Sequence, residues 1–134
     1  MNALERPRTL DELFSIYRPG MEFVAGGSDW VIKNHGRLAG GTSVADLSLM
    51  EELKGISFEG GLLRIGAMET MTDLHRSRLV RKYASALADA AYVMGSEQIR
   101  NRATVGGNVA NSSPAADTPA PLAALAARAV TASA

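Results

Sequence analysis

The sequence contains no cysteine, and this absence excludes several kinds of chemistry from the chain. Without thiols there is no disulfide, no thiol catalysis and no cysteine-ligated iron or zinc. Any iron–sulfur centre with which this protein worked would therefore have its ligands on another chain.

Three further features are missing. The 14 basic and 14 acidic residues cancel, and no basic stripe favours nucleic acid as a partner. No run of about eighteen apolar residues is present, so the sequence predicts no membrane span. The N-terminal residues Met1–Pro7 lack the basic-then-apolar order of a signal peptide, and we expect a cytoplasmic protein.

The chain has 134 residues, about the size of one domain with its own core. Its last residues, Leu122–Ala134, read as a helix followed by the first residues of a strand. The sequence then stops without a turn or a cap, which is typical of a truncated chain or of one piece of a divided subunit.

The stretch Ile99–Pro119 carries the strongest functional signal. It has few large apolar residues but contains paired glycines, three asparagines, hydroxyl side chains and Asp117. Paired glycines permit positive φ and close approach of a ligand, and the backbone N–H groups of such a turn converge on an anion. Asn, Ser and Thr side chains suit a ligand with many hydroxyl groups. The stretch is therefore predicted to cradle phosphate and sugar.

A second glycine pair lies in the segment Ala25–Lys33, between an expected strand and a short helix. Backbone N–H groups in such a loop, together with Ser28 and Asp29 at the helix start, favour an anion. The order Gly-x-Gly-x-x-Gly is absent, as is Gly-Lys-Ser/Thr, so Rossmann and P-loop sites are excluded.

Both glycine stretches resemble one family. Ile99–Asn108, with Ser113–Asp117 after it, resembles the second FAD-contacting loop of the flavoprotein subunit of molybdenum hydroxylases, which include xanthine dehydrogenase and carbon monoxide dehydrogenase. Ala25–Trp30 resembles the first loop, Ala-Gly-Gly-Thr-Asp-Leu, with Ser28 and Trp30 as departures. Ile65–Ala67, followed by Thr70 and Asp73-Leu74, resembles a third segment, whose backbone approaches the flavin near Ala67.

The resemblance implies an α+β fold of two small βα subdomains with FAD between them. The first would comprise residues 1–55 and the second, incomplete, residues 56–134. The cofactor-binding residues implied by the matching motifs are Val24, Ala25, Gly26, Gly27, Ser28, Asp29, Lys33, Ala67, Thr104, Val105, Gly106, Gly107, Asn108, Ser113 and Asp117.

Some of these residues have a second interpretation. Lys33 could neutralise a phosphate, but a solvated helix lysine is favoured. Asp117 could reach ribose hydroxyls or cap a helix that starts at Pro119 or Pro121. Arg100 and Arg102 could contact phosphate, although a structural pair with Glu97 is favoured.

The remaining pattern predicts ordinary elements. Thr9–Glu12 forms a capping box before a helix, residues 21–25 form a strand, and residues 55–66 form a hairpin around Gly60-Gly61. Thr72 is expected to cap a helix. A helical stripe from Tyr83 to Met94 ends at Gly95.

Three other features carry no site assignment. His35 is expected in a helix-ending turn, and Gly40-Gly41 in a hairpin or loop. The basic run His75–Lys82 is interpreted as a solvated helix face, with docking of a partner subunit as the alternative.

No nucleophile–base pair, carboxylate pair or metal-ligand cluster is visible. The resemblance therefore implies an electron-transfer subunit of an oxidoreductase, in which FAD supplies the redox chemistry. Its partners would be an iron–sulfur small subunit and a molybdopterin large subunit, and its acceptor NAD or another molecule. The alternatives are a truncated or cofactor-free scaffold of the same fold, and a single-chain flavin oxidase.

Overall fold

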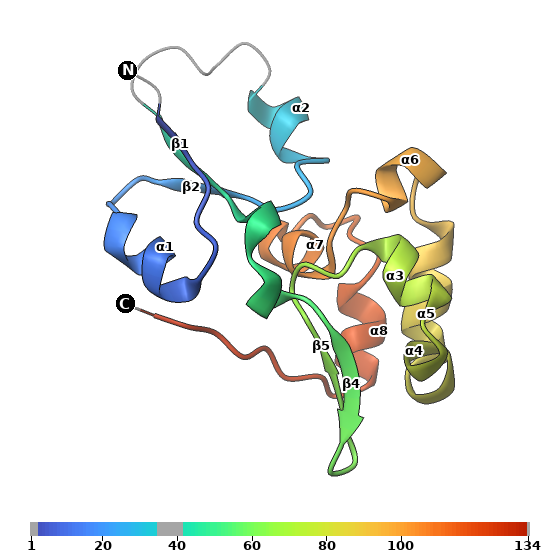
Figure 1. Cartoon of the computed structure of the whole chain (residues 1–134). Helices are drawn as coiled ribbons and strands as arrows, with labels where there is room; N and C mark the ends of the chain where they lie inside the picture. The colour runs from blue at the N-terminus through green and yellow to red at the C-terminus, as the bar shows by residue number, and fades with distance from the viewer. Residues whose placement is uncertain (1–2, 35–41, 134) are drawn as a thin grey trace.

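The computed structural model describes residues 3–34 and 42–133 of the chain. The expected His35 turn and the Gly40-Gly41 loop lie outside these ranges. Figure 1 shows a small sheet on one side and a group of helices on the other, joined by a central helix that follows Thr104. The fold is α+β, as predicted. In the described ranges, no helix is both long and apolar enough to cross a membrane.

The first part of the chain builds a three-stranded parallel sheet in the order β1-β3-β2. A small core of Leu13, Met21, Ala45 and Met50 lies against it. Its elements are β1 (Ala3–Glu5), α1 (Leu10–Ile16), β2 (Glu22–Val24), α2 (Trp30–Asn34), β3 (Ser43–Asp46) and the 3-10 turns η1 (Leu47–Leu49) and η2 (Glu51–Leu53).

The second part consists of a hairpin and a helical layer around a separate core, whose fully buried members include Met71, Leu74 and Leu87. Its elements are β4 (Ile56–Glu59), β5 (Leu62–Ile65), α3 (Met71–Arg76), α4 (Arg78–Tyr83), α5 (Ser85–Val93), α6 (Glu97–Arg100), α7 (Val105–Asn111) and α8 (Pro119–Ala124). The two cores divide near residue 55, and the subdomain boundary there stays a prediction.

The hairpin follows the prediction closely. Strands β4 and β5 pair in antiparallel register from Ile56↔Ile65 to Glu59↔Leu62. Gly60 and Gly61 both have positive φ, at 58° and 80°. Two consecutive positive φ angles define the tight turn that matches the twist of the paired strands.

Several helix ends differ from the sequence prediction. Thr9 accepts from the Glu12 N–H, but the Glu12 carboxylate accepts from the N–H of Arg8 and not from that of Thr9. Helix α3 is capped two residues earlier than expected, by a capping box of Thr70 and Asp73, so the assignment of Thr72 was wrong. Near the C-terminus, residues 127–133 form no strand.

Asp46 ties the parallel sheet to the turn that follows it. Its Oδ1 accepts from the Ser48 N–H at 3.0 Å, and its Oδ2 lies 3.2 Å from Arg6 Nε. Burial raises the pKa of Asp46, but the Ser48 hydrogen bonds and the charges of Arg6 and Arg102 outweigh it. The pKa of Asp46 therefore lies below its ordinary value.

This lowered pKa predicts a pH-dependent contribution to stability. A carboxylate whose pKa is lower in the folded state stabilises the fold above its unfolded pKa, about 3.9, and loses that contribution as pH falls through the lowered value. We expect the free energy of unfolding lost in Asp46→Asn to be constant near neutral pH and to shrink below about pH 4. Urea unfolding at a series of pH values tests this, with the exposed Asp11→Asn as control. A loss that is independent of pH would contradict the prediction.

Candidate functional site

The loop between β2 and α2 is fixed by close contact with the second part of the chain. A Cβ added to Gly26 would lie 1.7 Å from the carbonyl oxygen of Arg102, so only glycine fits. Gly27 has a φ of 77°, which also favours glycine. Arg102 Nε in turn donates to the Gly26 carbonyl at 3.3 Å. This loop therefore packs directly on the residues that lead into α7.

The glycine pair Gly106-Gly107 has a different role from the one predicted. Gly106 and Gly107 lie in the first turn of α7, which Thr104 caps, and neither has positive φ. The Gly106 N–H donates to Ala67 O at 2.9 Å, and the Gly107 N–H donates to Thr104 Oγ1 at 3.1 Å. The expectation of a positive-φ anion nest here was wrong, because these N–H groups already have acceptors.

Close packing explains why these two positions are glycine. A Cβ on Gly106 would lie 2.7 Å from Ala67 O, and one on Gly107 would lie 2.9 Å from Thr104 Oγ1. Thr104 also lies opposite Thr70 in an isolated bridge, which places the start of α7 beside the start of α3. Gly106 thus lets the first turn of α7 pack directly on the segment that leads into α3.

The first loop, by contrast, has backbone donors to offer. Among the residues that the structure describes, no hydrogen bond uses the N–H groups of Gly26, Gly27, Ser28 or Asp29. Unpaired N–H groups that follow one another in a turn are suited to an anion. The anion binding predicted for both loops is therefore expected mainly at the first.

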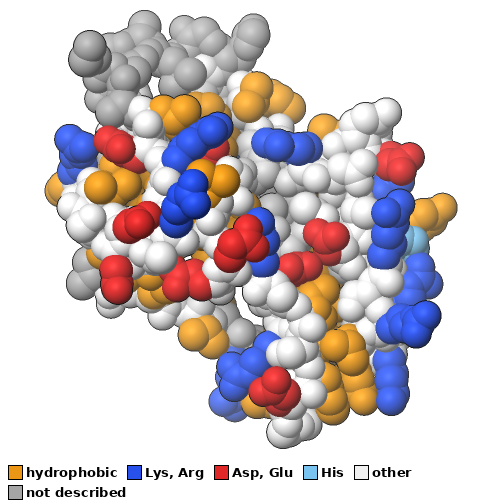
Figure 2. Space-filling model, viewed as in Figure 1, with side chains coloured by type: hydrophobic (Ala, Val, Ile, Leu, Met, Phe, Trp, Pro, Cys, Tyr) orange, Lys and Arg blue, Asp and Glu red, His pale blue; other side chains and the backbone are white. Residues whose placement is uncertain are grey.

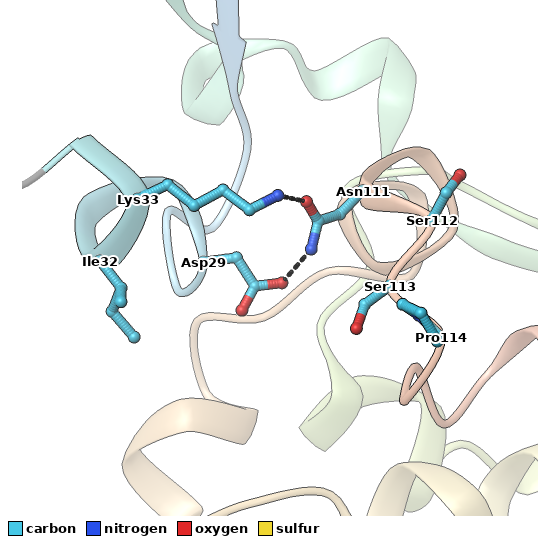
Figure 3. A pocket seen from close by; sticks show the side chains of 7 residues that line it. All are labelled: Asp29, Ile32, Lys33, Asn111, Ser112, Ser113 and Pro114. Atoms are coloured by element: carbon cyan, nitrogen blue, oxygen red, sulfur yellow. Dashed lines mark hydrogen bonds between the residues drawn. The ribbon is translucent and has the colours of Figure 1, made fainter.

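A cavity of about 400 Å³ opens between α2 and the end of α7 (Figure 3). Asn111 bridges its two sides, because its Oδ1 accepts from Lys33 Nζ while its Nδ2 donates to Asp29 Oδ2 at 2.6 Å. The lining residues are Asp29, Ile32, Lys33, Asn111, Ser112, Ser113 and Pro114. The volume lies within the range of small-molecule sites, about 300–1,000 Å³.

The comparison with known proteins decides the family. The whole chain, residues 1–134, matches the model described as FAD binding domain in molybdopterin dehydrogenase. The chain belongs to this family. FAD is the cofactor of these domains, as the resemblance of the two loops implied.

Individual relatives agree with this assignment. The chain is 36% identical over 115 residues to the nicotinate dehydrogenase FAD-subunit of Eubacterium barkeri, covering 83% of this chain and 39% of that protein. It is 36% identical over 122 residues to the xanthine dehydrogenase FAD-binding subunit of Escherichia coli O157:H7, covering 89% of this chain and 42% of that protein.

A solved structure gives the same result at the level of the fold. One chain of carbon monoxide dehydrogenase from Hydrogenophaga pseudoflava superposes with a TM-score of 0.81 at 32% identity, covering 88% of this chain and 42% of that chain. The present chain thus spans about two fifths of the length of the relatives that it matches.

Within this FAD-binding domain, most of the predicted residues lie near one another. Val24 ends β2, and Ala25 lies against Gly107, 3.6 Å from an added Cβ. Val105 is buried and donates its N–H to Glu69 O at 2.9 Å. Ser113 lines the cavity, and its Oγ accepts from the Ala115 N–H at 3.3 Å.

Asn108 and Asp117 differ from the simplest expectation. Asn108 is buried, and its Oδ1 accepts from both the N–H and the hydroxyl of Thr118. Helix α8 begins at Pro119 with Thr118, not Asp117, as its N-cap residue, so the capping role of Asp117 was wrong. Asp117 is half-buried and stays a predicted ligand residue.

The arginines before the second loop are structural. Arg100 Nη1 donates to the carbonyls of Met94 and Gly95, and Arg102 donates to Gly26. Among the described contacts, neither arginine pairs with Glu97, so this expectation was wrong. Trp30, which departs from the family pattern, is the first residue of α2. Its Nε1 donates to Glu22 Oε2 at 2.5 Å, and this bond holds the tryptophan side chain in place.

Asn111 is a candidate site residue that the sequence interpretation did not single out. It lies three positions after Asn108, so it was visible as part of the asparagine-rich stretch. Its importance depends on Asp29 and Lys33, about eighty positions earlier in the chain, which it contacts only in the folded structure.

Proposed function

We propose that this chain is the FAD-binding part of an electron-transfer subunit in a molybdopterin-dependent dehydrogenase. The observation that carries the proposal is the set of N–H groups from Gly26 to Asp29 that donate to no described residue, beside a cavity lined by Lys33 and Asn111. Family membership supports FAD as the ligand. When bound, FAD would take electrons from the iron–sulfur clusters of a small subunit and pass them to NAD or another acceptor.

The lining of the cavity fits the polar middle of FAD. The open N–H groups of the first loop suit the pyrophosphate, and Lys33 supplies a countercharge. Asp29, Asn111 and Ser113 offer acceptors and donors for hydroxyl groups. No aromatic side chain is among the described residues that line the cavity, so its chemistry matches phosphate and sugar better than a ring system.

Lys33 and Asn111 would exchange partners when a ligand binds. The Lys33 ammonium donates to the uncharged amide oxygen of Asn111. A phosphate oxygen is a stronger acceptor for an ammonium than an amide, because that hydrogen bond is charge-assisted at both ends. Asn111 would then be free to turn toward a ligand hydroxyl while it keeps its bond to Asp29.

The partners are proposed on the same basis. The chain has no cysteine, so the iron–sulfur clusters would lie on a small subunit and the molybdopterin on a large one. The substrate that is oxidised would be chosen by the large subunit. This chain would bind and position the flavin.

We expect Lys33→Met to weaken FAD binding about tenfold, equivalent to about 1.4 kcal/mol, because one charge-assisted contact to phosphate is lost. Titration of the purified chain with FAD, followed by flavin fluorescence, measures the dissociation constant. Lys54→Met is the matched control, since Lys54 pairs with Glu51 at 2.7 Å, away from the cavity. Equal losses in the two variants would contradict the role of Lys33.

The same titration with FMN in parallel tests the function itself. FMN lacks the adenosine half and the pyrophosphate, so a site built around the first loop should bind FAD more tightly. If the folded chain binds neither flavin, the proposal fails for this chain. The cofactor-free scaffold of the same fold would then be the better description.

A further inference from the structure

One edge of the helical layer carries a concentration of positive charge. Four exposed cations, Arg76, Arg78, Arg81 and Lys82, lie on α3 and α4, although the chain as a whole has a formal net charge of zero. Figure 2 shows blue side chains along one edge of the molecule, with a histidine and hydrophobic side chains among them. We call the surface formed by His75, Arg78, Arg81, Tyr92 and Val93, which lie on α3, α4 and α5, the α3–α5 basic face.

Arg81 is held in place by its neighbours. Its Nε donates to the carbonyl oxygen of His75 at 2.6 Å, and its Nη2 lies 3.0 Å from His75 Nε2. A freely solvated arginine side chain would make no such fixed contacts. This guanidinium is therefore already ordered before a partner binds, so binding costs less side-chain entropy.

Tyr92 continues the same contact network. Its ring stacks on His75 with centroids 4.5 Å apart, and the Arg100 guanidinium lies 5.5 Å from the Tyr92 ring centroid. Both are favourable aromatic and cation–π geometries. Tyr92 is nevertheless 56% exposed, and its neighbour Val93 is 69% exposed. An ordered guanidinium thus lies beside an exposed tyrosine and an exposed apolar residue.

This composition is that of a protein-binding surface. Arginine and tyrosine are enriched at the centres of interfaces and among the residues that dominate binding energy. Nucleic acid fits less well, because His75 already stacks on the ring that a base would need. Charge complementarity indicates an acidic partner, because ordered guanidinium groups pair best with carboxylates.

We propose that the α3–α5 basic face docks an acidic protein surface, in which carboxylates surround an apolar side chain. The carboxylates would meet Arg78 and Arg81, and the apolar side chain would meet Tyr92 and Val93. Arg78 and Arg81 are three positions apart on α4 and so lie on the same side of that helix. This docking is independent of the flavin site.

The test uses the full chain and a fluorescein-labelled, glutamate-rich peptide with a central Leu-Phe pair, followed by fluorescence anisotropy. We expect Arg78→Glu/Arg81→Glu to weaken binding about tenfold or more, as at interface centres. Tyr92→Ser should weaken binding severalfold without changing charge. The matched control, Arg64→Glu, should stay within about threefold, because exposed Arg64 lies on strand β5 and is not part of the face.

Three other outcomes of this experiment would overturn the proposal. Equal losses in Arg64→Glu and in the double variant would show a general charge effect, and no peptide binding would remove the basis for docking. Tighter binding of a short DNA duplex or of phosphatidylserine vesicles at the same face would make it a polyanion site instead. Unchanged circular dichroism and FAD affinity in the variants would separate this result from the proposed flavin function.

Discussion

Replacing Gly26 with alanine is expected to lower the free energy of unfolding by about 3 kcal/mol, the upper part of the usual range for overpacking. The added Cβ would lie 1.7 Å from Arg102 O and 2.5 Å from Arg102 C. The first distance is roughly half an ordinary contact between heavy atoms. Both obstructing atoms belong to the backbone, so no rotamer change can relieve the clash. The loop and the residues before α7 would have to separate.

The same separation should reduce flavin binding. The N–H groups of Gly26–Asp29 and the cavity residue Asn111 lie on the two segments that the clash would drive apart. We therefore expect a loss of FAD affinity of more than about tenfold, which corresponds to 1.4 kcal/mol. Urea unfolding and the FAD titration measure the two effects on one protein preparation.

Gly20→Ala is the matched control for this substitution. Gly20 has a φ of 86° and no atom within 4 Å of an added Cβ, so its cost is backbone strain of about 1–2 kcal/mol. Gly26 does not have positive φ, so its cost is steric alone. If Gly26→Ala were no more destabilising than Gly20→Ala, the close packing at Arg102 would not be the reason for glycine at position 26.

The glycine pairs also show what can be read from sequence and what cannot. Gly60-Gly61 lies between two alternating apolar segments, and its predicted tight turn is present. Gly106-Gly107 is the same dipeptide, yet it forms the first turn of a helix. The local sequence favours a turn in both places. The difference comes from Thr104, Ala67 and Glu69, whose oxygen atoms accept the N–H groups at the start of α7.

In the candidate site too, features that are continuous in the sequence could be predicted, and features that depend on packing could not. The Ala25–Asp29 loop was recognisable because its motif is continuous in the sequence, and the family assignment built on it is confirmed. The contribution of Asn111 was not, since its partners Asp29 and Lys33 are brought to it by the packing of the two parts of the chain. Likewise, the bond from Thr118 to Asn108 could not be inferred from spacing, because it depends on where α8 packs.

That last contact yields the second large prediction. Asn108 Oδ1 accepts from the Thr118 N–H at 3.2 Å and from the Thr118 hydroxyl at 2.6 Å, and Thr118 is fully buried. Asn108→Ala leaves both donors without their acceptor. A buried donor that loses its partner costs about 1–3 kcal/mol, so we expect a total loss of about 3 kcal/mol in the free energy of unfolding.

A double-mutant cycle separates this hydrogen bond from the cavity that alanine leaves. Thr118→Val removes the hydroxyl but keeps the N–H donor, so alone it should cost about 1 kcal/mol. In the Asn108→Ala background the hydroxyl is already unpaired, and its removal should then cost little or even stabilise the protein. The coupling expected between the two positions is about 1 kcal/mol, and strictly additive losses would contradict it. Because Asn108 lies on α7 and Thr118 precedes α8, such coupling would mean that the position of α7, beside the proposed flavin site, depends partly on its contact with the residue before α8.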